Sequence, residues 1–176
     1  APDRPAYWAK PPLTTRADLS AALIVAALSL VAGVAAGFGW YALAPQIEMV
    51  VQGDSAVPAQ PEGEALIGVD GRFGLIAAGA GALCAIVAFL WFRRRSIGVV
   101  CALVVGGYLA ARLAAFVGGW LGPAALSTHL GDPDGTRILR PLELRATGVM
   151  LLWPIAALLV YLALTLLFDR TERPPE

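Results

Sequence analysis

The sequence predicts an all-α integral membrane protein: a four-helix transmembrane bundle with a small β-structured extracytoplasmic cap. Hydrophobic residues make up 58% of the 176 residues and charged residues only 15%, and the mean hydropathy is +0.70. Four apolar runs are each long enough to cross a hydrocarbon layer of about 30 Å as a helix. The charged residues gather between these runs and near the two ends. This pattern is typical of a multi-pass membrane protein and not of a soluble domain.

The apolar runs set the organisation of the chain. A tail that contains several prolines, residues 1–18, precedes a membrane domain over 19–168, and a second tail covers 169–176. Within the domain we expect spans at about 19–44, 73–92, 97–121 and 147–168. The segment TTRADLS resembles a capping box and predicts a helix start near Arg16. Two long loops, 45–72 and 122–146, then lie on the same side of the membrane.

Basic residues in the short segments predict the orientation. The N-terminal tail, the C-terminal tail and the turn RRRS (Arg93, Arg94, Arg95) all carry basic residues, and four spans place these segments on one side. By the positive-inside rule that side is the cytoplasm. The high share of arginine, alanine and glycine favours a bacterial source. We therefore expect a bacterial plasma-membrane protein with cytoplasmic termini, whose arginine turn also offers a contact for anionic lipid.

The two long loops predict the cap. In the first loop, QIEMVVQ at 46–52 and ALIGV at 65–69 have strand character and are separated by turn-forming residues. We expect these two segments to form a small hairpin in preference to a disordered loop. In the second loop, the apolar residues of TRILRPLELRA at 136–146 offer a third strand. A third strand would stabilise a hairpin that is marginal on its own.

Small residues recur four positions apart on the expected helices. Such spacing allows helices to approach closely in lipid, where van der Waals packing drives association. The residues predicted to form this helix-packing interface are Gly33, Gly37, Ala111, Ala115, Gly118 and Gly119. Packing within one bundle is the favoured interpretation. A contact with a second copy or with a larger complex is the alternative. The third span suits such a contact best, because it carries small residues on more than one face.

Arg112 is the one ionisable residue well inside a predicted span. It lies eight residues before Trp120, which is expected at the outer interface, and this places it roughly 12 Å deep. A central arginine costs about 2.5 to 3.5 kcal/mol on the insertion scale. The side chain leans toward the helix N-terminus and therefore away from the nearer surface. We predict that Arg112 faces the bundle interior and is paired.

The fourth span and the loops contain the expected partners of Arg112. None of the four predicted spans contains an acid. Pro154 cannot donate a backbone hydrogen bond, so carbonyls in the preceding turn are expected to be free, and the neighbouring Trp153 needs an acceptor. An outer-loop carboxylate, Glu143 or Glu48, is a further candidate. Arg112 would then either lock two helices together or anchor an anionic ligand such as a lipid phosphate or a quinone.

No motif in the sequence predicts catalysis. The chain lacks a nucleophile motif, a phosphate-binding loop and a pair of catalytic acids. His129 has no second histidine or cysteine nearby, and DPDG at 132–135 lacks the spaced ligands of a calcium loop. We therefore expect no catalytic residue, no metal and no cofactor. A lipid-modifying enzyme would need Glu48, Glu64, His129 and Glu143 to cluster in the cap.

The order of several segments resembles an actinobacterial family of four-span membrane proteins that is classed as a domain of unknown function. The resemblance covers about residues 19–168. It rests on Ala44-Pro45, Glu62-Gly63-Glu64, Asp70-Gly71, Arg112 and Trp153-Pro154. The family has no established activity, so the resemblance implies a compartment and a topology and no chemistry.

These observations predict a non-enzymatic protein. We expect an accessory, assembly or stabilising subunit of a larger envelope or respiratory membrane complex, because the chain has no acid-lined path and no internal repeat of a transporter. The alternative is a protein that binds or transports a lipid or small anion through Arg112 and the outer cap. The expected partners are membrane lipids and other membrane subunits. A net charge of zero gives no reason to expect nucleic acid.

Overall fold

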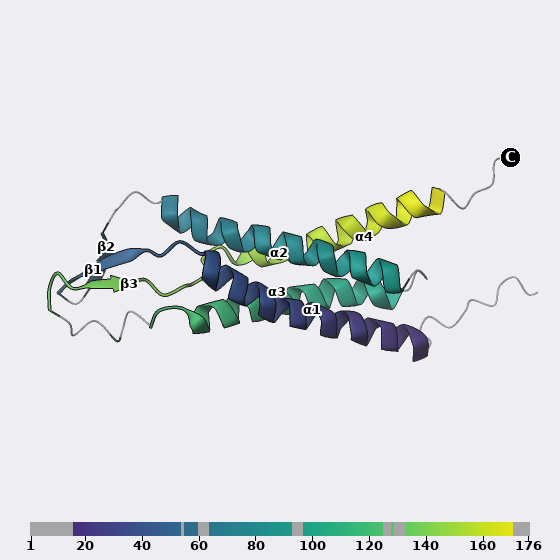
Figure 1. Ribbon diagram of the computed structural model, residues 1–176, viewed down its shortest axis with the longest axis horizontal. Helices are drawn as coiled ribbons and strands as arrows, with labels where there is room; N and C mark the ends of the chain where they lie inside the picture. The colour runs from purple at the N-terminus through teal and green to yellow at the C-terminus, as the bar shows by residue number, and fades with distance from the viewer. Residues whose placement is uncertain are drawn as a thin grey trace, which may run out of the picture.

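A computed structural model describes residues 16–170 except 54, 60–63, 93–96, 125–127 and 129–132, with the backbone alone at 17, 64–66 and 169–170. Its helices are α1 (Arg16–Leu43), α2 (Glu64–Trp91), α3 (Ile97–Leu121) and α4 (Leu152–Arg170), and a short 3-10 helix, η2 (Thr147–Leu151), leads into α4. Four described helical segments are long and apolar enough to cross a membrane. This confirms the helical part of the predicted fold (Figure 1).

A three-stranded antiparallel sheet lies beyond one end of the helices, which we call the cap end (Figure 1). The strands are β1 (Glu48–Gln52), β2 (Ser55–Pro58) and β3 (Arg137–Leu139), in the order β2-β1-β3. Met49 pairs with Ile138, and these two side chains are buried with Val51 in a small core of the sheet. The turn after β1 uses Gly53 at a positive φ of 57°, where glycine avoids steric cost. A small sheet is therefore present and includes the predicted third strand, but β1 forms its hairpin with Ser55–Pro58 and not with the predicted segment.

One predicted strand is wrong. The segment ALIGV at 65–69 begins α2, which starts at Glu64 and not at 73; the second strand is Ser55–Pro58. Short apolar runs do not distinguish strand from helix by periodicity. Continuing the helix buries Val69, Phe73 and Ala77 on one face at intervals of four residues. This packing against the rest of the bundle outweighs the local strand preference.

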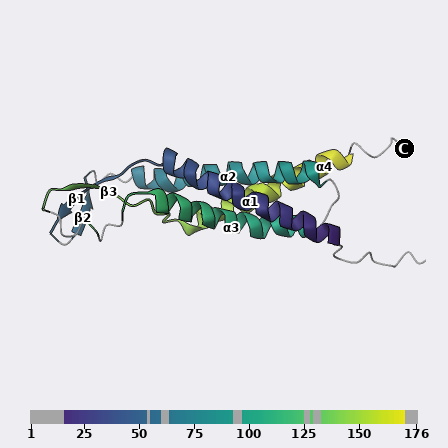
Figure 2. The same ribbon diagram turned by 60° about the horizontal axis from the view of Figure 1, so that its bottom comes forward.

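The bundle consists of two tightly packed helix pairs. The most extensive contacts join α1 to α3 and α2 to α4, and Figure 2 shows α1 running along α3. A Cβ atom added to Gly33 would lie 2.6 Å from the Ala110 carbonyl oxygen, and one added to Gly37 would lie 2.8 Å from that of Ala114. The two backbones approach this closely because both glycines lack side chains. The small residues of α1 therefore act within the bundle.

The small residues of α3 also face neighbouring helices or the cap. Ala111 is fully buried, and Ala115 packs against the core. Gly118 lies under the Trp40 ring, and Gly119 lies beside the Leu142 carbonyl. Each of these positions is used within this chain.

Trp40 packs inside the molecule near the end of α1. It is fully buried, its indole N–H donates to the Val69 carbonyl over 3.1 Å, and its ring meets Phe73 edge-on at 5.0 Å. The hydrogen bond allows a buried tryptophan to keep a polar partner. The exposed aromatic residues toward the cap end include Tyr41 and Trp120.

Candidate functional site

The polar site predicted around Arg112 is not assembled. Arg112 is exposed on the outer face of α3, so the prediction that it faces the bundle interior is wrong. Glu48 lies in the sheet, where it forms an exposed ion pair with Arg137 at 3.2 Å, and Glu143 is also exposed. Neither carboxylate enters the bundle.

The helical repeat explains the position of Arg112. Ala110, Ala111 and Ala114 are buried against the neighbouring helices. Successive residues are about 100° apart around a helix axis, so residue 112 then points away from the bundle. The same face carries an exposed row, the Arg112 stripe, which consists of Cys101, Val105, Tyr108, Arg112, Phe116 and Trp120.

The Arg112 stripe is apolar apart from the guanidinium and the Tyr108 hydroxyl. Phe116 is 70% exposed and Trp120 is 76% exposed. Arg112 lies nine residues before the end of α3 and fifteen after its start, or about 13 and 22 Å at 1.5 Å per residue. Its guanidinium forms no hydrogen bond or ion pair with another residue that the structure describes. The charge is therefore placed where a membrane-spanning helix would meet lipid.

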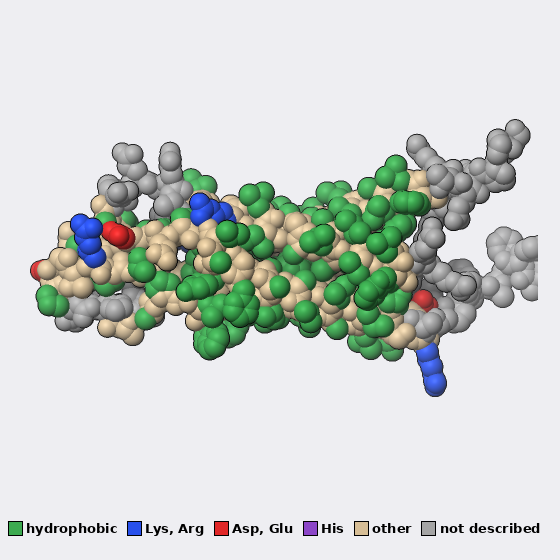
Figure 3. Space-filling view, in the orientation of Figure 1, with side chains coloured by type: hydrophobic (Ala, Val, Ile, Leu, Met, Phe, Trp, Pro, Cys, Tyr) green, Lys and Arg blue, Asp and Glu red, His purple; other side chains and the backbone are tan. Residues whose placement is uncertain are grey.

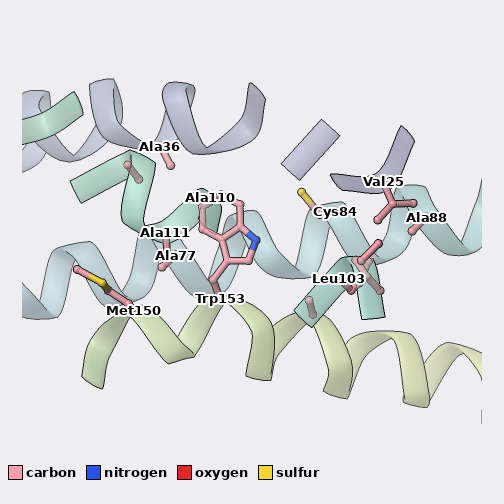
Figure 4. Close-up of a cluster of buried hydrophobic side chains, with 14 of the residues drawn as sticks. Val25, Ala36, Ala77, Cys84, Ala88, Leu103, Ala110, Ala111, Met150 and Trp153 are labelled. Atoms are coloured by element: carbon pink, nitrogen blue, oxygen red, sulfur yellow. The ribbon is translucent and has the colours of Figure 1, made fainter. Parts of the chain in front are cut away.

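Trp153 and Pro154 lie at the centre of the bundle, away from Arg112. Figure 4 shows the Trp153 ring reaching from α4 among Ala77, Ala110 and Ala111. Trp153 is fully buried, and its indole nitrogen has no partner among the described residues. Pro154 is the third residue of α4, where a missing N–H is tolerated. The predicted break inside one long helix is absent. Instead, the 3-10 helix η2 ends and α4 begins just before Pro154.

Asp70 joins α2 to the start of η2. The backbone N–H groups of Arg145 and Ala146 donate to its carboxylate over 3.3 and 2.9 Å. These groups lie at the beginning of a helix, where N–H groups lack partners and negative charge is favourable. Two residues further on, Arg72 donates to the Leu43 carbonyl at the end of α1. Charged side chains of α2 thus fix both neighbouring helix ends.

Asp70→Ala is expected to lower the stability of the protein by about 1 kcal/mol, because the start of η2 then loses its acceptor. Denaturation of the detergent-solubilised protein would measure the loss. Asp70→Asn keeps one acceptor oxygen and is expected to lose less. Equal stability of the alanine variant and the wild type would contradict the capping role.

A second cationic feature, absent from the sequence predictions, lies at the cap end. Arg140 lines three adjoining hollows between the sheet and the helices. Its backbone N–H donates to the Ile47 carbonyl over 2.9 Å, which fixes the position of the residue after β3. Burial lowers the pKa of Arg140, the nearby charge of Arg145 lowers it further, and Glu143 raises it. The signal in the sequence was the three arginines of TRILRPLELRA.

Apart from Arg112, the charged side chains that the structure describes lie toward the ends of the molecule. On the face shown in Figure 3, hydrophobic side chains cover the helices, and the coloured acidic and basic groups lie toward the cap end and the opposite end. Arg93, Arg94, Arg95 and His129 lie outside the described residues, as does the side chain of Glu64. Among the residues that are described, no three histidine, cysteine or acidic side chains form a group that could hold a metal ion.

Comparison with known proteins adds no further information on the site. No protein-family model matches the chain, and no curated protein or solved structure matches it. The family resemblance drawn from the sequence therefore stays a prediction.

Proposed function

We propose that the protein is an accessory, assembly or stabilising subunit of a larger membrane complex in a bacterial plasma membrane, with the cap outside and both termini in the cytoplasm. The observation that supports this proposal is the exposed guanidinium of Arg112 in the middle of α3. A charged side chain facing lipid at this depth costs about 2.5 to 3.5 kcal/mol on the insertion scale. A partner helix that covers the Arg112 stripe and supplies an acceptor removes that cost.

The charge pattern favours a different protein over a second copy. The middle of each of the four membrane-crossing segments is free of aspartate and glutamate, so a symmetric dimer through the Arg112 stripe would bring like charges together. Like charges at an interface cost free energy. The partner we propose carries an acidic side chain, or backbone carbonyls opened by a helix break, at the depth of Arg112. The aromatic residues of the stripe then supply apolar contact area.

Site-specific photo-crosslinking tests this proposal. A photoreactive residue at position 116 lies one turn from Arg112 and is expected to form a covalent adduct with one membrane protein. The same residue at 159 is the matched control, because Leu159 of α4 is exposed to a similar degree, 63% against 70%, and has no charge nearby. Mass spectrometry of the adducts would identify the partner. Recovery of the chain as a lone monomer, with lipid adducts alone at both positions, would contradict the proposal.

The alternative function, binding or transport of a lipid or anion through Arg112, has less support. The hollows described at the cap end do not include Arg112, so the residue and the cap do not form one site.

A further inference from the structure

We propose that the cap end binds the phosphate of an anionic membrane lipid, with Arg140 as its principal ligand and Arg145 as a second cation. The site is the Arg140 groove, formed by the three hollows that share this residue. Residues that line it include Tyr41, Pro45, Leu121, Arg140, Leu142 and Arg145. The proposal goes beyond the subunit function, because it concerns a different part of the molecule and a different kind of partner.

The shape of the groove suits an amphiphile. One hollow of about 260 Å³ runs past Tyr41, Pro45 and Leu121 near the ends of α1 and α3. A second, of about 440 Å³, lies beside the sheet next to Arg140 and Arg145. Near the helices, Pro45, Leu121 and Leu142 form an apolar wall beside polar groups. Near the sheet, the lining carries charged side chains. A lipid whose phosphate contacts the arginines would lay its glycerol and upper acyl chain along the apolar wall.

The charges in the groove favour an anion. Arg140 and Arg145 are close enough for their charges to oppose one another, which is a cost that a bound phosphate would relieve. The guanidinium of Arg140 forms no hydrogen bond or ion pair with the residues that the structure describes. Two carboxylates also line the groove. Glu143 is exposed, and Asp70 accepts the N–H groups of Arg145 and Ala146.

The position along the bundle favours a lipid over a soluble anion. Tyr41 lies near the end of α1 and lines the groove, and Trp120, also at the cap end, is 76% exposed. Exposed tyrosine and tryptophan at the ends of membrane-spanning helices mark the headgroup level. A free phosphate ion would leave the apolar wall of the groove unused.

The test measures lipid retained by the full chain in nanodiscs that contain phosphatidylglycerol and phosphatidylcholine. Native mass spectrometry is expected to show preferential retention of phosphatidylglycerol. Arg140→Gln is expected to weaken this retention about tenfold, as for the loss of one charge-assisted hydrogen bond. Arg137→Gln is the matched control, because Arg137 belongs to the same segment but pairs with Glu48. This variant is expected to retain phosphatidylglycerol as the wild type does.

Two further measurements keep the test decisive if Arg140→Gln folds poorly. Arg140→Lys keeps the charge and is expected to retain most of the binding. Leu121→Gln keeps both arginines but interrupts the apolar wall, and is expected to weaken lipid retention. Equal retention of the two lipids by the wild type would overturn the proposal. So would displacement of phosphatidylglycerol by millimolar inorganic phosphate, because the site would then be one for a free anion.

Discussion

Arg112→Leu is expected to improve the membrane insertion of α3 and at the same time to remove the partner from the purified protein. The substitution replaces a charged residue by an apolar one at mid-span, which favours insertion by about 3 kcal/mol. A glycosylation-based insertion assay would measure that gain. Co-purification in mild detergent would measure the loss of the partner. A gain in insertion together with a loss of the partner would show that Arg112 contacts a partner and does not stabilise the fold.

Arg16→Leu is the matched control for this experiment. Arg16 is also exposed, but it stands at the first position of α1, at the end of the bundle opposite the cap. Its replacement is expected to leave co-purification unchanged. If Arg112→Leu kept the partner at wild-type stoichiometry, the stripe would not be the interface. If it instead lowered the thermal stability of the isolated chain, a structural role for the arginine would be indicated.

The second large effect is expected at Gly81. A Cβ atom at this position would lie 2.3 Å from the Trp153 carbonyl oxygen and 3.1 Å from the carbonyl carbon. These are backbone atoms, so they cannot move aside without separating α2 from α4. Gly81→Ala is therefore expected to destabilise the protein by about 3 kcal/mol, the upper part of the usual range for overpacking.

Gly79→Ala is the control for Gly81→Ala. It lies two residues away on α2, and an added Cβ there meets no atom within 4 Å. Alanine has the higher helix propensity, so this variant is expected to match or exceed the wild type in stability. Denaturation of both variants in the same detergent would compare them. Equal stability of the two variants would show that α2 and α4 do not approach as closely as the structure places them.

The sequence predicted the positions of the helices along the chain but not their rotations. Hydropathy locates a span because any face of the helix can meet lipid. Rotation depends on which helices are neighbours, and α3 has small residues on several faces. Arg112 is predicted to face inward because a charge facing lipid is unfavourable, whereas the close packing of Ala110 and Ala114 on α1 turns it outward.

The cap, too, was predicted only in part from the sequence. Apolar segments and turn residues were enough to predict strands at β1 and β3. Arg140 could not be selected from the sequence as a site residue, because several arginines lie in the same loop. Arg140 differs from the other arginines because its backbone N–H bonds to the Ile47 carbonyl and because it lines the groove. Both features depend on the pairing of β3 with a strand about 90 residues earlier in the chain.

The pairing of α1 with α3 also constrains the order in which the molecule can be built. Gly33 and Ala110 are 77 positions apart, so the ribosome has made α1 and α2 long before the partner of α1 emerges. During that interval the glycine face of α1 has only lipid or α2 to contact. The last helix, α4, packs against α2 after the α1–α3 pair has become possible. The burial of Trp153 between the helices is therefore expected to be the last step of folding.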